Sequence, residues 1–86
     1  MSTTITIEFQ VAVEIYKFQL KNKYPTYADL TYAMKDILDK VKLATILTCL
    51  FDWQIIEIAA VPINSCAQMK ISEAAIPMIK KMYSEK

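Results

Sequence analysis

The 86-residue sequence contains no glycine, no histidine and no arginine, and each absence excludes a class of site. A phosphate-binding loop that brings the backbone close to a nucleotide needs glycine, so a P-loop is excluded. Every turn that requires a positive φ must be formed by Asn, by Asp, or by another residue under strain. Because arginine is absent, all ten basic residues are lysines, which contact phosphate as point charges and lack the bidentate fork that reads guanine.

The scarcity of chemically reactive side chains argues against catalysis and metal binding. The two cysteines, Cys49 and Cys66, cannot form a tetrahedral zinc site without further ligands, and histidine is not available to supply them. No cysteine stands at a suggestive distance from a lysine or carboxylate that would activate it. We therefore predict that the protein is not an enzyme, and we expect no catalytic residues, no metal, no cofactor and no small-molecule ligand.

The length and composition predict a single globular domain over residues 1–86. The chain is 55% hydrophobic and 22% charged, which is typical of a folded domain with apolar surface left for a partner. A homodimer is the simplest use of that surface. No apolar run approaches the roughly 18 residues of a membrane span, and no signal-like leader opens the chain, so we expect a cytoplasmic protein without a membrane partner.

The hydrophobic periodicity and the turn residues predict four helices and one β-hairpin. Residues 5–15 also alternate as a strand would, but the apolar pattern continues to residue 20, and that length favours a helix. The predicted elements are helices over about 7–22, 27–35 and 40–53, strands over about 55–61 and 68–71, and a last helix that begins near residue 72. Thr4 or Thr6, Thr26, Asp39 and Ser72 are the expected N-caps.

The second and third predicted helices form a helix-turn-helix. Small-then-large apolar spacing is typical of two short helices that cross steeply, with Ala33 giving room and Leu43 and Ile46 filling the angle. We expect Leu43, Ile46, Leu47 and Leu50 to point inward from the third helix.

Two segments carry a resemblance to a known family. LATILTCLFDWQIIEI (43–58) and QMKISEAAIPMIKKMYSEK (68–86) resemble the recognition helix, first wing strand, second wing strand and closing helix of winged helix-turn-helix proteins. These proteins are common among archaeal and bacterial transcriptional regulators. The resemblance implies an α+β, mainly α fold with a three-helix core, a two-stranded β-hairpin wing and a C-terminal helix. Gln54, Ala75 and Ile37 depart from the family pattern, which favours glycine at each of these positions.

The resemblance also implies where double-stranded DNA would bind. In this family the solvent face of the third helix enters the major groove. On this chain, Lys40 and Lys42 would contact phosphates, while Thr45 and Thr48 would touch a base edge or a thymine methyl. Lys70 is the one lysine of the wing. The few base-reading side chains predict shape-based specificity, and the plain alternative is a solvated helix face with ordinary lysines.

The resulting prediction is a DNA-binding transcriptional regulator that acts as a homodimer through its first and last helices. Two copies would double the phosphate contacts of a chain whose net charge is only +1. The rival interpretation is a winged-helix protein–protein interaction module without DNA binding, which the low net charge and the nearly uncharged wing favour. A third is a nucleoid or mobile-element protein that binds DNA without sequence preference.

Overall fold

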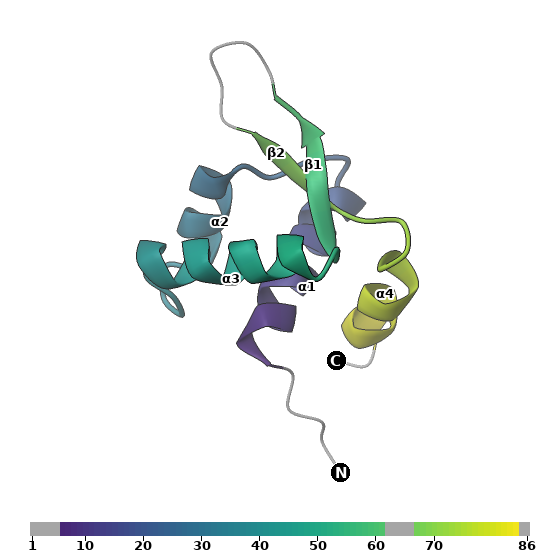
Figure 1. Cartoon of the computed structure of the whole chain (residues 1–86), viewed down its shortest axis with the longest axis horizontal. Coiled ribbons are helices and arrows are strands. Elements are labelled where there is room, and N and C mark those ends of the chain that lie inside the picture. The colour runs from purple at the N-terminus through teal and green to yellow at the C-terminus, as the bar shows by residue number, and fades with distance from the viewer. Residues whose placement is uncertain (1–5, 62–66, 85–86) are drawn as a thin grey trace.

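The computed structural model describes residues 6–61 and 67–84, and it consists of four helices and one antiparallel pair of strands (Figure 1). In chain order the elements are α1 (Ile7–Leu20), α2 (Tyr27–Ala33), α3 (Lys40–Asp52), β1 (Ile56–Ala60), β2 (Gln68–Ile71) and α4 (Ile76–Ser84). The prediction of an α+β, mainly helical fold is confirmed, and the order of the elements is compatible with a winged-helix layout.

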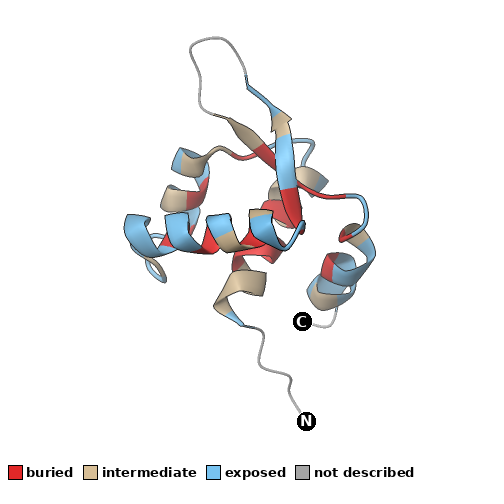
Figure 2. Cartoon of the chain, viewed as in Figure 1, coloured by how far each residue is buried: buried red, intermediate tan, exposed pale blue. Residues whose placement is uncertain are grey.

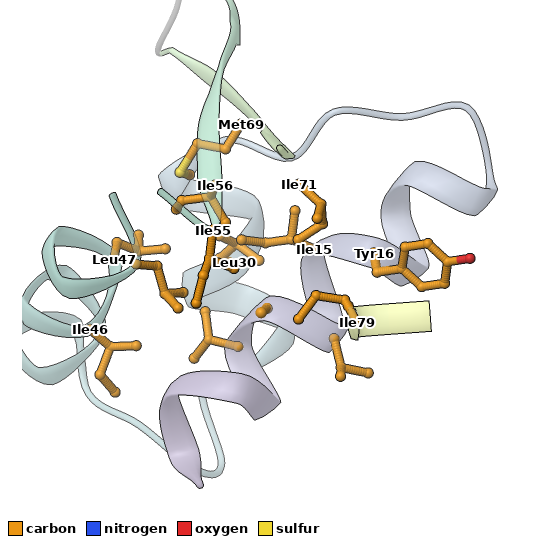
Figure 3. Close-up of a cluster of buried hydrophobic side chains, with 14 of the residues drawn as sticks. Ile15, Tyr16, Leu30, Ile46, Leu47, Ile55, Ile56, Met69, Ile71 and Ile79 are labelled. Atoms are coloured by element: carbon orange, nitrogen blue, oxygen red, sulfur yellow. The ribbon is translucent and has the colours of Figure 1, made fainter. Parts of the chain in front are cut away.

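Helix α1 is the centre of the hydrophobic core. Five of its residues are buried by the rest of the chain, and the helix contacts α2, α3, α4 and β2. Figure 3 shows Ile15 of this helix among side chains from the other elements, with Tyr16 at the edge of the cluster. The buried residues of α1 are Val11, Ala12, Val13, Ile15 and Tyr16. These five residues of α1 are thus used in the core of a single chain.

The predicted N-caps of α2 and α3 are confirmed. Thr26 and Asp29 form a capping box, in which each side chain accepts a hydrogen bond from the other residue's backbone N–H. Asp39 caps α3 by accepting from the Lys42 N–H at 2.8 Å. Thr6 is the N-cap residue of α1 but forms no side-chain capping bond there, and Thr4 lies outside the described residues.

Two helices end with a residue in the left-handed conformation, although the chain has no glycine. Asn22 after α1 has φ 60°, and Gln54 after α3 has φ 59°. Each end is a Schellman motif: after α3, the Ile55 N–H donates to the Leu50 carbonyl and the Gln54 N–H to the Phe51 carbonyl, both at 3.0 Å. Gln54 therefore adopts the left-handed conformation for which winged helix-turn-helix proteins favour glycine. Unlike glycine, it has a Cβ, which makes this conformation energetically unfavourable.

The β-hairpin is joined to the helices by a short segment before α2. The Met69 N–H donates to the Pro25 carbonyl at 2.8 Å, and Thr26 forms an isolated antiparallel bridge with Gln68. This strand-like contact was not predicted, because Pro25 marks the segment as a turn in the sequence. A second link is the Ile71 N–H, which donates to the Gln19 side-chain oxygen of α1 at 3.0 Å.

The start of the last helix differs from the prediction. Ser72 is not the N-cap of a continuous helix; residues 73–75 form a turn, and α4 begins at Ile76. The Ser72 hydroxyl donates instead to the Gln54 carbonyl at 2.7 Å, so it is engaged by the end of α3. The backbone carbonyl of Ser72 accepts from the Ala75 and Ile76 N–H groups and closes the turn.

The crossing of α2 and α3 uses different residues from those expected. Ala33 is exposed, while Leu30 and Met34 are the buried residues on this side of the helix-turn-helix. With about 100° between successive residues, Ala33 lies roughly 80° away from the middle of the Leu30–Met34 stripe. Ile37 lies exposed in the connecting turn, and it has no positive φ.

Over the residues that are described, no helix combines the length and apolar character needed to traverse a lipid bilayer.

Candidate nucleic-acid interface

The helix-turn-helix holds α3 with its inner face on the core and its outer face in solvent. The inward prediction is confirmed, since Leu43, Ile46, Leu47 and Leu50 are all buried. Figure 2 shows α3 at the front of the molecule, with exposed segments alternating with buried ones along its length. Where the two helices begin, the Tyr27 hydroxyl donates to the Lys40 carbonyl, and this bond links the first residue of α2 to the first residue of α3.

The outward stripe of α3 is the set of residues opposite the buried ones. α-Helical periodicity places positions i, i+4, i+7 and i+11 from residue 41 on this side, and all four are exposed. The outward stripe consists of Val41, Thr45, Thr48 and Asp52. Of the predicted site residues, Thr45 and Thr48 lie in its middle. Val41 and Asp52 were missed, although the same spacing that identifies the buried stripe also locates its opposite.

The two predicted lysines of α3 lie on either side of the outward stripe. Lys40 and Lys42 are both exposed, and helical geometry separates them by roughly 200° across the outward stripe. Neither ammonium forms an ion pair with any residue that the structure describes. They flank Val41, whose side chain has 76% of its area accessible, at the opposite end of the stripe from Asp52.

Both threonine hydroxyls on the stripe are used as donors within the helix. Thr45 Oγ1 donates to the Val41 carbonyl at 3.1 Å, and Thr48 Oγ1 donates to the Ala44 carbonyl at 3.0 Å. Because a hydroxyl has one hydrogen, each oxygen is left to act as an acceptor. The stripe therefore offers acceptors and methyl groups in its middle, with cationic donors only at its edges.

Lys70 differs from the other predicted site lysines because it has an ionic partner. Its ammonium lies 3.2 Å from a carboxylate oxygen of Glu57, directly across the two strands. The hydrogen bond and the charge of Glu57 raise the pKa of Lys70 above its usual value. The described part of the strand pair β1–β2 is thus locally neutral, so Lys70 is less available to a phosphate than Lys40 or Lys42. Cys66 and Asn64 lie outside the described residues.

Several other aromatic and cationic side chains either have a structural role or lie away from the outward stripe. Tyr27 packs against the core and bonds to α3, whereas Tyr32 is exposed with the Lys35 ammonium 4.6 Å above its ring. Lys21 and Lys23 are exposed in the Schellman turn after α1. Cys49 is a free, half-buried cysteine. In the described ranges, no group of three or more His, Cys, Asp or Glu residues is placed to hold a metal ion.

Comparison with known proteins identified no relative of this chain. No protein-family model matches the chain, and neither the curated proteins nor the solved structures contain a match.

Proposed function

We propose that the protein is a winged helix-turn-helix transcriptional regulator that presents the outward stripe of α3 to the major groove of double-stranded DNA. The observation that supports this is the placement of Lys40 and Lys42. Both are exposed, both lack an ionic partner among the described residues, and they lie on either side of Val41, at the end of the stripe that is remote from Asp52. Two cations separated in this way match the two phosphate backbones that border a groove.

The position of these lysines within α3 strengthens the argument. Lys40 is the first residue of the helix and Lys42 the third, and the first turn contains no acidic residue. Cations at a helix N-terminus oppose the macrodipole, so they destabilise an isolated helix slightly. The Asp39 cap offsets part of this cost. Lysines at a helix N-terminus that bring no gain in packing are typical of functional positions. A bound anion, such as a DNA phosphate, would interact favourably with both the lysines and the helix N-terminus.

We further propose that the protein binds as a homodimer. With a net charge of +1, one chain offers few phosphate contacts, and a second copy doubles them. Of the two predicted seams, α1 contributes five buried residues to the core of its own chain, whereas α4 carries exposed apolar side chains at Met78 and Tyr83, so we favour α4. Light scattering coupled to size-exclusion chromatography, with and without duplex DNA, tests this stoichiometry.

The test of DNA binding is a fluorescence-anisotropy titration with mixed-sequence duplex at about 50 and 200 mM salt. We expect affinity to fall steeply with salt. Replacing both Lys40 and Lys42 by Ala should weaken binding and reduce the slope of log K against log salt by about 2 for each copy that is bound.

A matched control is the double substitution of Lys21 and Lys23 by Ala. Both side chains are exposed in the turn after α1, away from α3 and from the proposed seam on α4, and the change in net charge is identical. If the two double variants lose affinity equally, binding follows net charge and not the placement of the lysines on α3. If the wild-type protein does not bind at low salt at tens of micromolar, the proposal is wrong.

The second candidate function is docking to a protein. Tyr32, Ile37 and Val41 are all exposed around the helix-turn-helix, and the ion pair between Lys70 and Glu57 leaves the wing neutral. Exposed apolar groups on a near-neutral surface fit a protein partner better than a phosphate backbone. Absence of DNA binding at low salt would make this module the leading function.

A further inference from the structure

The chemistry of the outward stripe restricts which base pairs it can read. Three consecutive members of the stripe, Val41, Thr45 and Thr48, are uncharged, β-branched and exposed. β-Branched side chains have few χ1 rotamers, so their methyl groups are held in nearly constant positions on a helix. Ala44, beside them, is also exposed and adds another methyl. The middle of the stripe is therefore a small, rigid surface of methyl groups.

The hydrogen bonds inside α3 remove the polar donors from this surface. The hydroxyl hydrogens of Thr45 and Thr48 are directed to the carbonyls of Val41 and Ala44. In the major groove, guanine presents two acceptors, O6 and N7, which need donors from the protein. The chain has no arginine, and the lysines of α3 lie at the edges of the stripe. The middle of the stripe is thus poorly matched to guanine.

Thymine and adenine match it better. Thymine carries a C5-methyl group in the major groove, and adenine presents an N6 amino donor there. The methyl can pack against Val41 and the threonine methyls, while a threonine oxygen accepts from the amino group. Cytosine also presents an amino donor but has no methyl, so thymine supplies the distinguishing contact.

We infer that the outward stripe of α3 selects A·T-rich major grooves by contacting thymine methyl groups with Val41 and Thr45. This inference rests on the proposed DNA binding and specifies its ligand. It differs from recognition by DNA shape, which depends on groove width and flexibility and not on the thymine methyl itself. Asp52, at the far end of the stripe, lies about 16 Å from Val41 along the axis, so its negative charge is separated from this contact.

The experiment compares one A·T-rich duplex with the same duplex in which every thymine is replaced by uracil. Uracil lacks only the C5-methyl, so phosphate contacts and base pairing are retained. We expect the uracil duplex to bind the wild-type protein more weakly, by about fourfold for each methyl contacted and more than tenfold for two. The dependence on salt should be the same for both duplexes, because the number of phosphate contacts is unchanged.

Two variants separate the methyl contact from other effects. Val41→Ala combined with Thr45→Ser removes methyl groups, keeps the hydroxyl and changes no buried residue, so the thymine-to-uracil ratio should fall toward one. Lys40→Ala combined with Lys42→Ala should weaken binding to both duplexes and leave the ratio unchanged. Equal affinity of the wild-type protein for both duplexes overturns the inference alone. No binding to either duplex overturns the proposed function, and the inference with it.

Discussion

The Tyr27 hydroxyl donates a hydrogen bond to the main-chain carbonyl of Lys40, and this bond joins the first residues of the two helices in the helix-turn-helix. Its position has two consequences. It restrains the angle between α2 and α3 at one end of the motif, and it holds the backbone of a residue that we propose contacts phosphate. The aromatic ring of Tyr27 also packs against the hydrophobic core.

Removing this hydroxyl with Tyr27→Phe should destabilise the fold by about 1 kcal/mol, since the ring packing is retained and one hydrogen bond is lost. Urea-induced unfolding, followed by circular dichroism, measures the change in free energy. The matched control is Tyr32→Phe: the Tyr32 side chain is 73% exposed, and its ring remains available to Lys35. Equal stability losses in the two variants would show that the bond to Lys40 contributes nothing.

The left-handed conformation of Gln54 predicts a stabilising substitution. Gln54→Gly should raise the unfolding free energy by about 1 kcal/mol, because glycine adopts φ 59° without the clash that a Cβ causes. The hydrogen bond from Ser72 is kept, since it is accepted by the main-chain carbonyl. Thermal or urea unfolding provides the measurement.

Gln54→Ala is the control for this prediction, because alanine removes the long side chain and retains the Cβ. It should give no comparable gain. Asn22→Gly at the corresponding end of α1 should stabilise by less, since asparagine tolerates the left-handed region better than glutamine. A gain from alanine as large as that from glycine would refute the strain argument.

The ion pair between Glu57 and Lys70 predicts that neutralising Glu57 will strengthen DNA binding. Glu57→Gln removes the carboxylate that holds the Lys70 ammonium at 3.2 Å, which makes the wing cationic. If the wing approaches a phosphate, the slope of log K against log salt should increase in magnitude by about 1. Lys70→Ala should reduce the magnitude of this slope more in the Glu57→Gln background, where the ammonium is unpaired, than in the wild-type background.

The difference in stability between the wild-type protein and Glu57→Gln should decrease as the pH rises into the alkaline range. Because Glu57 raises the pKa of Lys70, the pair stabilises the folded state below the usual lysine pKa of about 10.4. This contribution is lost as the pH rises through the raised pKa. The difference in unfolding free energy between wild type and Glu57→Gln should be small at neutral pH, since the pair is on the surface, and should vanish in strong alkali. A difference that grows with pH would contradict this assignment.

Features that depend on a few neighbouring residues were predictable from the sequence. Thr26 with Asp29, and Asp39 with the Lys42 N–H, form the expected caps because a capping bond joins residues only three apart. The buried stripe of α3 follows from helical spacing alone. The absence of glycine correctly indicated that Asn, or a strained residue, must occupy left-handed positions, as Asn22 and Gln54 do.

Features that depend on contacts between residues distant in the sequence could not be predicted from it. Ser72 has the local signature of an N-cap, but its hydroxyl bonds to Gln54, which is 18 residues away in sequence. Pro25 is typical of a turn in the sequence, yet its carbonyl accepts a hydrogen bond from the Met69 N–H of β2. Lys70 was named from the sequence as a candidate phosphate contact, and only the strand register reveals that Glu57 lies opposite it.

The sequence by itself therefore determined the order of the helices and strands, the caps of α2 and α3, and the two faces of α3, since these follow from hydrogen bonds and periodicity within a few residues. The tertiary structure decided that α1 lies at the centre of the core, and that Lys70 is paired while Lys40 and Lys42 are not. The physical reason is that burial and ion pairing depend on which segments meet in space, and local spacing does not encode those meetings.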